Sequence, residues 1–377
     1  GTVIVMDPKT GAILAQASAP TFDPNISSTI TLNKLRNPAV QEVYEPGSTG
    51  KVITVAAALQ EGLVTPQSIF TIPYKMKVAD EYFHDHEKHP TQRLTTTGLL
   101  AVSSNTGSIQ IGQKLGKETL YNYLRKFGIG QSTNSKLPGE SAGILHPVKE
   151  WSGVTLPFLS IGYEIRMTPL QVLGLYAAVA NNGKLMQPHI IKEIRDNDKV
   201  IEKYEPKVLN KQIAKPATIA AVRKMLEGVV DSGTASNIRN QYYKIAGKTG
   251  TNLIADDNKG FREKKYQASF VGYFPAQNPV YACIVVVNKP DINIGYYGSS
   301  VAAPVFKDIA DRLYSTDETI HPSLKSNKNS LFLSPMKGLK SEIDRISNYF
   351  DWDILSNNVN TDMVTAIASK NKLVVKP

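Results

Sequence analysis

Residues 44–60 read YEPGSTGKVITVAAALQ, and this stretch decides much of the expected fold. Pro46-Gly47 ends whatever element precedes it. Ser48 then starts a segment in which the residues from Lys51 to Gln60 are rich in Ala, Val, Ile and Leu. Because serine is a good N-cap, we expect a buried helix that begins at or near Ser48.

Ser48 and Lys51 are three residues apart, so on a helix they share a face. A serine hydroxyl is a weak nucleophile, and a neutral lysine amine could act as the base that it needs. Burial and nearby positive charge would have to lower the pKa of Lys51 several units below about 10.4. Taken alone, the Ser-x-x-Lys pattern is more typical of a helix cap with a solvated lysine. Ser334-Pro335-Met336-Lys337, which we interpret as a surface turn, matches it too.

A second motif, Ser103-Ser104-Asn105, interrupts a helical stretch from Leu94 to Leu115. The hydroxyl of such a Ser-x-Asn triplet could relay a proton, and its amide could hold a substrate carbonyl. A loop or a helix cap is the alternative interpretation.

A third motif, Lys248-Thr249-Gly250-Thr251, ends a strand predicted from Tyr243 to Thr251. Strand alternation places Thr249 and Thr251 on one face, where their hydroxyls could bind a carboxylate. Gly250 would leave room for a substrate backbone, and Lys248 would add positive charge. The alternative is an ordinary strand end with a bulge.

The remaining pattern predicts an α+β fold, with strands at both ends of the chain and helices between them. The expected elements are a hairpin of Thr2–Met6 and Ala12–Ala17, helices at Thr168–Asn181, Ala217–Val230 and Ala302–Tyr314, and strands at Tyr266–Phe274 and Val280–Asn288. We expect one domain over residues 1–315, a linker over 316–330, and a small C-terminal appendage of uncertain fold over 331–377.

Composition bounds the possible functions of these 377 residues. Apolar residues make up 41% and charged residues 20%, which indicates a globular protein. Cys283 is the single cysteine, which excludes an internal disulfide, and its apolar neighbours predict a core strand. The net charge of +10 is scattered without basic runs, so we expect no nucleic-acid partner. The sequence has no run of about 18 apolar residues, so it predicts no membrane span.

In this order, the three motifs resemble those of the penicilloyl serine transferases. Segments in and around the motifs are similar to class B penicillin-binding protein transpeptidase domains, over residues 1 to about 314. The similarity is greatest to the cell-division (septal) members. These segments are Gly1–Asp7, Gly11–Ala15, Tyr44–Ser48, Gly162–Tyr163, Met167–Gln171, Ala180–Gly183, Ser232–Ala235, Ala246–Thr251 and Ser269–Pro275. The resemblance implies the penicillin-binding/β-lactamase-like fold, an antiparallel sheet of about five strands flanked by an all-helical region.

The resemblance also implies a reaction, crosslinking of peptidoglycan stem peptides through a Ser48 acyl-enzyme with release of D-Ala, which β-lactams block covalently. In this implied mechanism Lys51 is the base, Ser103 relays the proton, Asn105 holds the acyl-side amide, and Lys248 tunes this network. Thr249, Gly250 and Thr251 would form the substrate-binding strand. The backbone N–H groups of Ser48 and Thr251 would form the oxyanion hole. No metal and no cofactor are implied.

The implied setting is the periplasmic face of the bacterial cytoplasmic membrane, reached through an anchor absent from this chain. Stem peptides ending in D-Ala-D-Ala, β-lactams, a glycosyltransferase and other division proteins would be its partners. Gly1 already opens a strand pattern, so we expect a domain excised from a longer protein.

Two alternatives stay open: a D,D-carboxypeptidase or β-lactamase-type hydrolase of the same fold, and a penicillin-sensing or scaffold domain without turnover. We see no obvious glutamate to activate a deacylating water, and three intact motifs argue against a scaffold. The stretch Phe83–His89, with three His and two carboxylates, has the composition of a metal site, but we interpret it as a loop. We interpret Tyr296-Tyr297-Gly298 as an ordinary turn rather than a binding-site rim.

Overall fold

The computed structural model describes residues 1–256, 260–321, 336–349, 352, 354–356, 361–369 and 372–376. The chain divides into two compact units, Gly1–Thr316 and Asp317–Pro377, and each is described by itself. Ser334 and most of the predicted linker lie outside the described residues.

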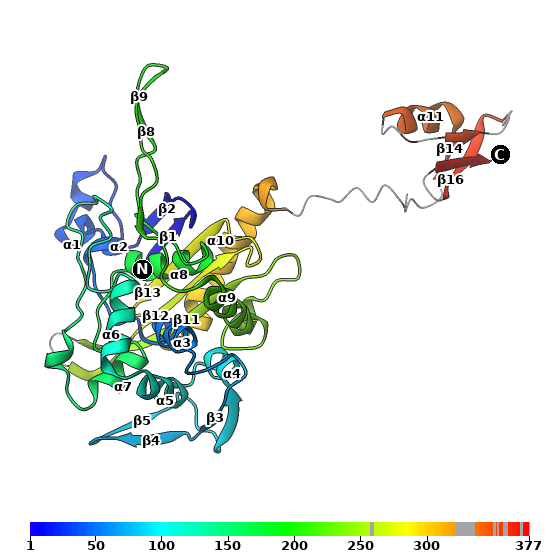
Figure 1. Ribbon diagram of the computed structural model, residues 1–377. Coiled ribbons are helices and arrows are strands. Elements are labelled where there is room, and N and C mark those ends of the chain that lie inside the picture. The colour runs from blue at the N-terminus through cyan, green and yellow to red at the C-terminus, as the bar shows by residue number, and fades with distance from the viewer. Residues whose placement is uncertain are drawn as a thin grey trace. The chain divides into compact units, whose positions relative to one another are not determined.

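The first unit is built on a five-stranded sheet in the order β11-β12-β13-β1-β2, in which every neighbouring pair is antiparallel (Figure 1). Its strands are β1 (Thr2–Met6), β2 (Ile13–Ser18), β11 (Ala246–Asp256), β12 (Gly260–Phe274) and β13 (Tyr281–Asn288). The predicted sheet of N-terminal and C-terminal strands is confirmed. Strands β11 and β12 extend beyond their predicted bounds, because backbone pairing continues into polar residues that carry no apolar alternation.

The two faces of this sheet pack against two separate cores, as a period of two along each strand requires. Ile4, Tyr273 and Ile284 belong to the larger core on the helical side. Phe270 and Cys283 belong to the second core, which contains Phe306 of α10 (Ala303–Thr316). Cys283 is fully buried, which confirms its prediction as a core residue.

The helical region packs on the first face around α8 (Pro169–Ala180), whose residues are all buried. Thr168 caps α8 through a capping box with Gln171, and Pro169 occupies its first turn. The helices of this region are α1 (Leu32–Leu35), α2 (Pro38–Gln41), α3 (Lys51–Gln60), α4 (Thr96–Ala101), α5 (Asn105–Leu115), α6 (Lys117–Lys126), α7 (Thr155–Ser160), α8 (Pro169–Ala180) and α9 (Pro216–Asp231).

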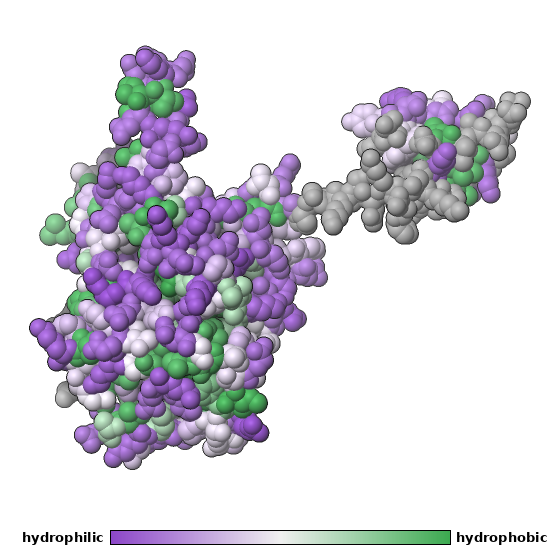
Figure 2. All heavy atoms as spheres, viewed as in Figure 1, coloured by the Kyte–Doolittle hydropathy of each residue, from purple (hydrophilic) through white to green (hydrophobic). Residues whose placement is uncertain are grey.

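Four two-stranded sheets complete the described part of the first unit. Their strands are β3 (Ile69–Ile72) with β6 (Gln92–Thr95), β4 (Lys75–Val78) with β5 (Glu81–His84), β7 (Leu185–Met186) with β10 (Val208–Asn210), and β8 (Glu193–Asp196) with β9 (Lys199–Lys203). The β8–β9 hairpin projects from the body of the unit (Figure 1). It carries exposed apolar side chains, among them Ile194 and Ile201 (Figure 2).

The described residues of the second unit form a sheet of their own, in the order β14-β16-β17-β15, and one α-helix. Its elements are β14 (Met336–Leu339), α11 (Lys340–Tyr349), β15 (Ile354–Ser356), β16 (Met363–Ser369) and β17 (Lys372–Lys376). Ile343 of α11 is buried together with Val364, Ala366, Leu373 and Val375 of the sheet. Across the described parts of both units, no helix is both long and apolar enough to cross a bilayer.

Candidate active site

The three sequence motifs meet at one cavity of about 590 Å³ in the first unit. Ser48, Ser103, Asn105, Thr249 and Thr251 all line it. These residues come from the 3₁₀ turn before α3, from the turn between α4 and α5 with the first residue of α5, and from strand β11. Tertiary packing therefore gathers motifs that lie far apart in the sequence around a single space.

Ser48 does not cap a helix, and this part of the sequence prediction is wrong. It lies in a 3₁₀ turn, Gly47–Thr49, and Gly50 is the N-cap residue of α3. A hydrogen bond of 2.7 Å from Gly50 N to Gly47 O closes that turn. The Ser48 hydroxyl is therefore not used in capping, and among the described residues it has no hydrogen-bond partner. It is half-buried and lines the cavity.

The turn that carries Ser48 is held from two sides. Gly47 N donates to Gly162 O at 2.9 Å, and Asn252 Nδ2 donates to Glu45 O. A Cβ atom on Gly47 would lie 1.9 Å from Asn252 Oδ1, and one on Gly162 would lie 2.1 Å from Gly47 O. Only glycine fits at either position.

Lys51 is completely buried, so the alternative of a solvated lysine is wrong. Its Nζ donates to Ser103 O and Asn105 Oδ1, both at 2.6 Å, and reaches Ser103 Oγ at 3.3 Å. Burial lowers the pKa of the Lys51 amine to about 7, and the negative charge of Asp85 opposes this shift. Between the described residues, no hydrogen bond joins Lys51 Nζ to Ser48 Oγ.

Ser103 lies between two helices, α4 and α5, as the interrupted pattern predicted. Its φ of +62° is in the left-handed region, which a residue with a Cβ adopts at a cost of order 1–3 kcal/mol. Ser104, not Ser103, caps α5 by accepting a hydrogen bond from Gly107 N. The cap thus leaves Ser103 and Asn105 on either side of it to face Lys51.

Strand β11 is at the edge of the sheet and presents Thr249 and Thr251 to the cavity, as strand alternation predicted. Thr249 Oγ1 shares a hydrogen bond of 2.8 Å with Thr234 Oγ1, and Thr251 Oγ1 accepts one of 3.0 Å from Gly298 N. Lys248 is fully buried, and both burial and the charge of Lys51 hold the pKa of its amine well below the usual range.

Gly250 faces the other way, so the reason predicted for this glycine is wrong. A Cβ atom there would lie 2.5 Å from Ser269 Oγ and 3.0 Å from Thr49 Cγ2. The missing side chain makes room for β12 and for the turn of Ser48, not for a ligand backbone.

Tyr297 is a cavity residue, which corrects its interpretation as part of an ordinary turn. Its hydroxyl lies 2.8 Å from His86 Nε2, and the two rings meet edge to face with centroids 5.0 Å apart. Nothing local in the sequence signals this, because the two residues are 211 positions apart.

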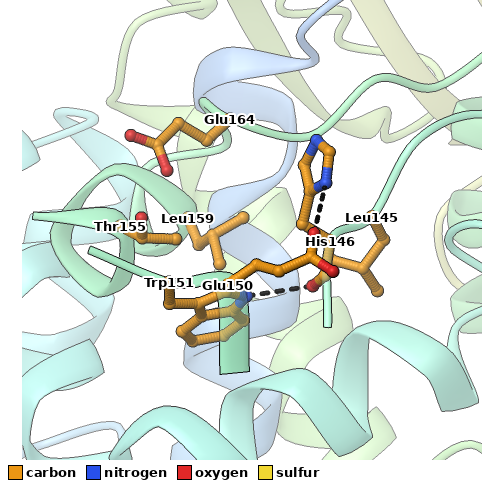
Figure 3. A pocket seen from close by; sticks show the side chains of 7 residues that line it. All are labelled: Leu145, His146, Glu150, Trp151, Thr155, Leu159 and Glu164. Atoms are coloured by element: carbon orange, nitrogen blue, oxygen red, sulfur yellow. Dashed lines mark hydrogen bonds and ion pairs between the residues drawn. The ribbon is translucent and has the colours of Figure 1, made fainter. Parts of the chain in front are cut away.

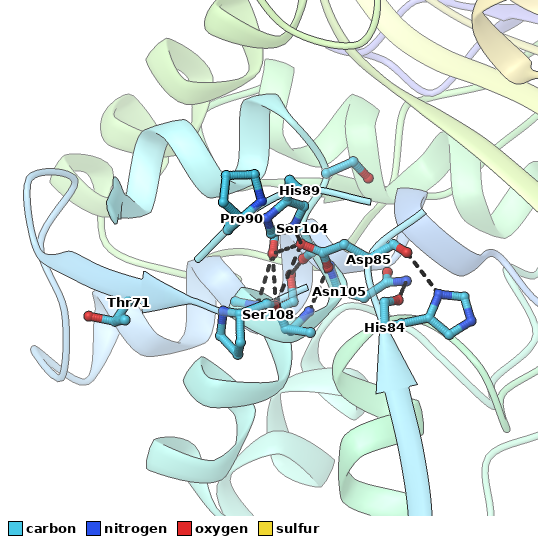
Figure 4. Close-up of polar contacts among 12 residues, drawn as sticks. Thr71, His84, Asp85, His89, Pro90, Ser104, Asn105 and Ser108 are labelled. Carbon is cyan, nitrogen blue, oxygen red and sulfur yellow. Dashed lines mark hydrogen bonds and ion pairs between the residues drawn. The ribbon is translucent and has the colours of Figure 1, made fainter. Parts of the chain in front are cut away.

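The His-rich stretch after β5 also borders the cavity, and Asp85 is its buried member. Figure 4 shows Asp85 pointing toward Ser104 and Asn105, while the His84 ring is bonded to the Asp85 carbonyl. The side chains of His84, Asp85, His86 and His89 thus bond to protein groups in this structure. In the part of the chain that is described, no group of three or more His, Cys, Asp or Glu is placed to hold a metal.

A second cavity, of about 60 Å³, lies between Trp151, His146 and Leu159 (Figure 3). Trp151 Nε1 donates to His146 O at 2.9 Å, and His146 pairs with Glu150 at 3.2 Å. The space is about a tenth of the larger cavity and contains none of the motif residues, so it adds nothing to the candidate site.

Comparison with known proteins agrees with this arrangement. Residues 1–311 match the family model of the penicillin binding protein transpeptidase domain. Penicillin-binding protein PbpB of Mycolicibacterium smegmatis is 35% identical over 322 residues, 83% of this chain and 49% of that protein. Peptidoglycan D,D-transpeptidase FtsI of Escherichia coli is 33% identical over 312 residues, 81% of this chain and 50% of that protein. This chain thus spans about half the length of such curated relatives.

A crystal structure of penicillin binding protein 3 from Mycobacterium tuberculosis, complexed with aztreonam, has the same fold. Its TM-score is 0.78 at 34% sequence identity, covering 85% of this chain and 73% of that one. Residues 1–311, which the family model matches, contain the sheet, the helical region and all three motifs. The chain therefore belongs to the penicillin-binding protein transpeptidase family.

Proposed function

We propose that the first unit is the catalytic domain of a peptidoglycan D,D-transpeptidase, which crosslinks stem peptides and releases D-Ala. One observation carries the proposal: a fully buried amine, Lys51, is bonded to Ser103 and Asn105 beside a cavity lined by Ser48, whose hydroxyl has no hydrogen-bond partner among the described residues. The names of the relatives support the same reaction class.

In the first half-reaction, Ser48 Oγ attacks the carbonyl carbon between the two D-Ala residues and forms a C–O bond. The neutral Lys51 amine accepts the hydroxyl proton, which a pKa of about 7 allows in a large fraction of molecules at neutral pH. The backbone N–H groups of Ser48 and Thr251 would stabilise the oxyanion. When the C–N bond breaks, Ser103 passes the proton on to the departing D-Ala amine.

In the second half-reaction, an amine of a neighbouring stem peptide attacks the carbonyl carbon of the Ser48 ester and forms a C–N bond. The C–O bond to Ser48 breaks, and the proton that the amine loses returns to the Ser48 oxygen. Asn105 would hold the acyl-side amide, while Thr249 and Thr251 would bind the terminal carboxylate of the donor peptide. Lys248 is buried next to Thr249 and would tune this network through charge, since the charge of Lys51 lowers the pKa of the Lys248 amine. A β-lactam enters the same path, and its ester stays on Ser48.

The decisive experiment is mass spectrometry of the intact protein after incubation with benzylpenicillin. We expect one adduct of one penicillin mass on Ser48, absent from Ser48→Ala and retained in Ser334→Ala. An adduct on Ser334, or no adduct on the folded wild-type protein, would falsify the proposal.

A donor ending in D-Ala-D-Ala separates this proposal from the hydrolytic alternatives. A transpeptidase joins the donor to an added acceptor amine, whereas a carboxypeptidase releases D-Ala without one. A β-lactamase hydrolyses nitrocefin repeatedly, whereas a transpeptidase consumes about one equivalent per site. A sensor or scaffold domain would be acylated by penicillin but would not turn over the peptide.

We further propose a role in septal wall synthesis at the periplasmic face of the membrane, with a glycosyltransferase and division proteins as partners. Similarity to the FtsI and PbpB proteins supports this assignment. Depletion of the full-length protein should give long, undivided cells. Swollen cells that still divide would instead indicate a role in elongation.

A further inference from the structure

Asp85 follows β5 and is the most connected carboxylate near the cavity, with only 6% of its surface exposed. Its Oδ1 accepts hydrogen bonds from the backbone N–H of Asn105 at 2.5 Å and of Thr106 at 2.9 Å. Its Oδ2 accepts from Ser104 Oγ at 2.8 Å and faces His89 Nε2 at 3.0 Å (Figure 4). A carboxylate so far from water is stable only because these donors surround it.

These bonds attach Asp85 to the first turn of α5, an 11-residue helix whose first residue is Asn105. The first N–H groups of a helix have no partner within it, and a negative charge there is stabilised by the helix dipole. Asp85 therefore fixes the start of α5, which is also the point where the backbone presents Asn105 to Lys51.

The side chain of Asn105 is fixed by the same segment. Its Nδ2 donates to His84 O at 2.9 Å, so its Oδ1 is left to accept from Lys51 Nζ at 2.6 Å. The backbone of His84 and the carboxylate of Asp85 thus hold Asn105 by its side chain and its main chain together. A shift of this segment would move the amide away from Lys51.

His89, on the same loop, pairs with Asp85. Its Nδ1 lies 2.7 Å from Pro90 O and its Nε2 lies 3.0 Å from Asp85 Oδ2, and both partners are acceptors. The ring donates both bonds only when it carries both protons, so these two acceptors favour the imidazolium form of His89. The bond to Pro90 O, together with Asp85, raises the pKa of His89.

We propose that Asp85, paired with His89, is a positioning residue for acylation, which holds the Ser103–Asn105 turn against Lys51 and sets the charge around that amine. This inference rests on the proposed function, because acylation is the reaction that it concerns. The groups that interact with the Asp85 charge are His89 on its own loop and Lys51 from α3, and Lys51 interacts in turn with Lys248 on β11. His86, Glu87 and Lys88 of the same loop line the cavity beside Asp85.

The charge effects have opposite signs for the two partners. Asp85 favours the ammonium form of Lys51 and so raises its pKa against the effect of burial. Removing the Asp85 charge should lower the pH at which Lys51 becomes a base. Removing His89 leaves Asp85 unneutralised and should raise that pH.

The test uses the full chain and the rate of acylation by benzylpenicillin, measured against penicillin concentration and against pH. Fitting the concentration dependence separates the reversible dissociation constant from the maximal acylation rate. Asp85→Asn should lower the maximal rate on the order of ten- to a hundredfold, because Asn105 and Ser103 lose their fixed position. The dissociation constant should change much less, and the midpoint of the pH profile should move to lower pH.

Glu81→Gln is the matched control, since it removes an exposed carboxylate from the same hairpin without touching the turn. It should acylate as the wild type does. His89→Ala is the second variant, and it should shift the pH midpoint upward even if Asp85→Asn does not fold.

The proposal fails if folded Asp85→Asn keeps the wild-type rate and midpoint, or if His89→Ala leaves the midpoint unchanged or lowers it. Wild-type protein that forms no adduct on Ser48 would instead refute the proposed function. The two failures are therefore distinguishable.

Discussion

At the scale of single residues, the site depends on how burial changes the chemistry of Lys51. An exposed lysine is protonated at neutral pH, whereas here burial brings the pKa of the amine to about 7. The protein offsets part of the cost of burying this group with hydrogen bonds to Ser103 O and Asn105 Oδ1.

The first prediction concerns the pH dependence of acylation. Only neutral Lys51 can accept a proton, so the acylation rate should rise as the pH increases through about 7 and then level off. Stopped-flow measurement with a chromogenic β-lactam would give this profile for the wild-type protein. A rate that stays flat between pH 5 and 9 would show that Lys51 is not the base.

The second prediction concerns removal of the amine. Lys51→Ala should slow acylation by about two to four orders of magnitude, the contribution of a well-placed general base, while the protein still folds. Lys114→Ala, which removes an exposed lysine from α5, is the matched control and should react normally. Acylation of Lys51→Ala at the wild-type rate, by intact-mass time courses, would contradict the assignment.

At the scale of elements, the turn of Ser48 depends on glycines that allow backbone segments to touch. Gly47 has a φ of +52° and no space for a Cβ atom beside Asn252. Gly62 has a φ of +69°, yet nothing lies within 4 Å of the place where its Cβ would be. This pair separates the cost of a left-handed conformation from the cost of a collision.

The third prediction follows from that pair. Gly62→Ala should lower the free energy of unfolding by about 1–2 kcal/mol, the conformational cost alone, and leave acylation unchanged. Gly47→Ala should cost about 1–3 kcal/mol more, because the added methyl displaces Asn252 or the turn, and acylation should fall sharply. Urea unfolding and penicillin labelling of both variants test this. Equal stability losses would rule out the collision.

At the scale of the whole molecule, all residues that line the larger cavity belong to the unit Gly1–Thr316. That unit also contains both large hydrophobic cores, and the small second unit has a core of its own. Folding and acylation should therefore be properties of the first unit.

The fourth prediction is that a chain ending at Thr316 folds and reacts with benzylpenicillin at the rate of the full chain. Its melting temperature should lie within a few degrees of the melting temperature that the first unit has in the full chain. Loss of the adduct, or a non-cooperative unfolding curve, would mean that residues 317–377 support the site.

The sequence by itself determined the α+β class, the central sheet, most of its strands, and the motif residues Ser48, Lys51, Ser103, Asn105, Thr249 and Thr251. These follow from local signals, since apolar periodicity and short motifs depend on neighbouring residues. Only the tertiary structure decided that Ser48 lies in a 3₁₀ turn and is free of capping, and that Lys51 is fully buried. It alone also brought Asp85, His86 and Tyr297 to the cavity. The physical reason is that burial, hydrogen-bond partners and pKa values depend on segments distant in the chain, here strand β11, the loop after β5 and the loop after β13.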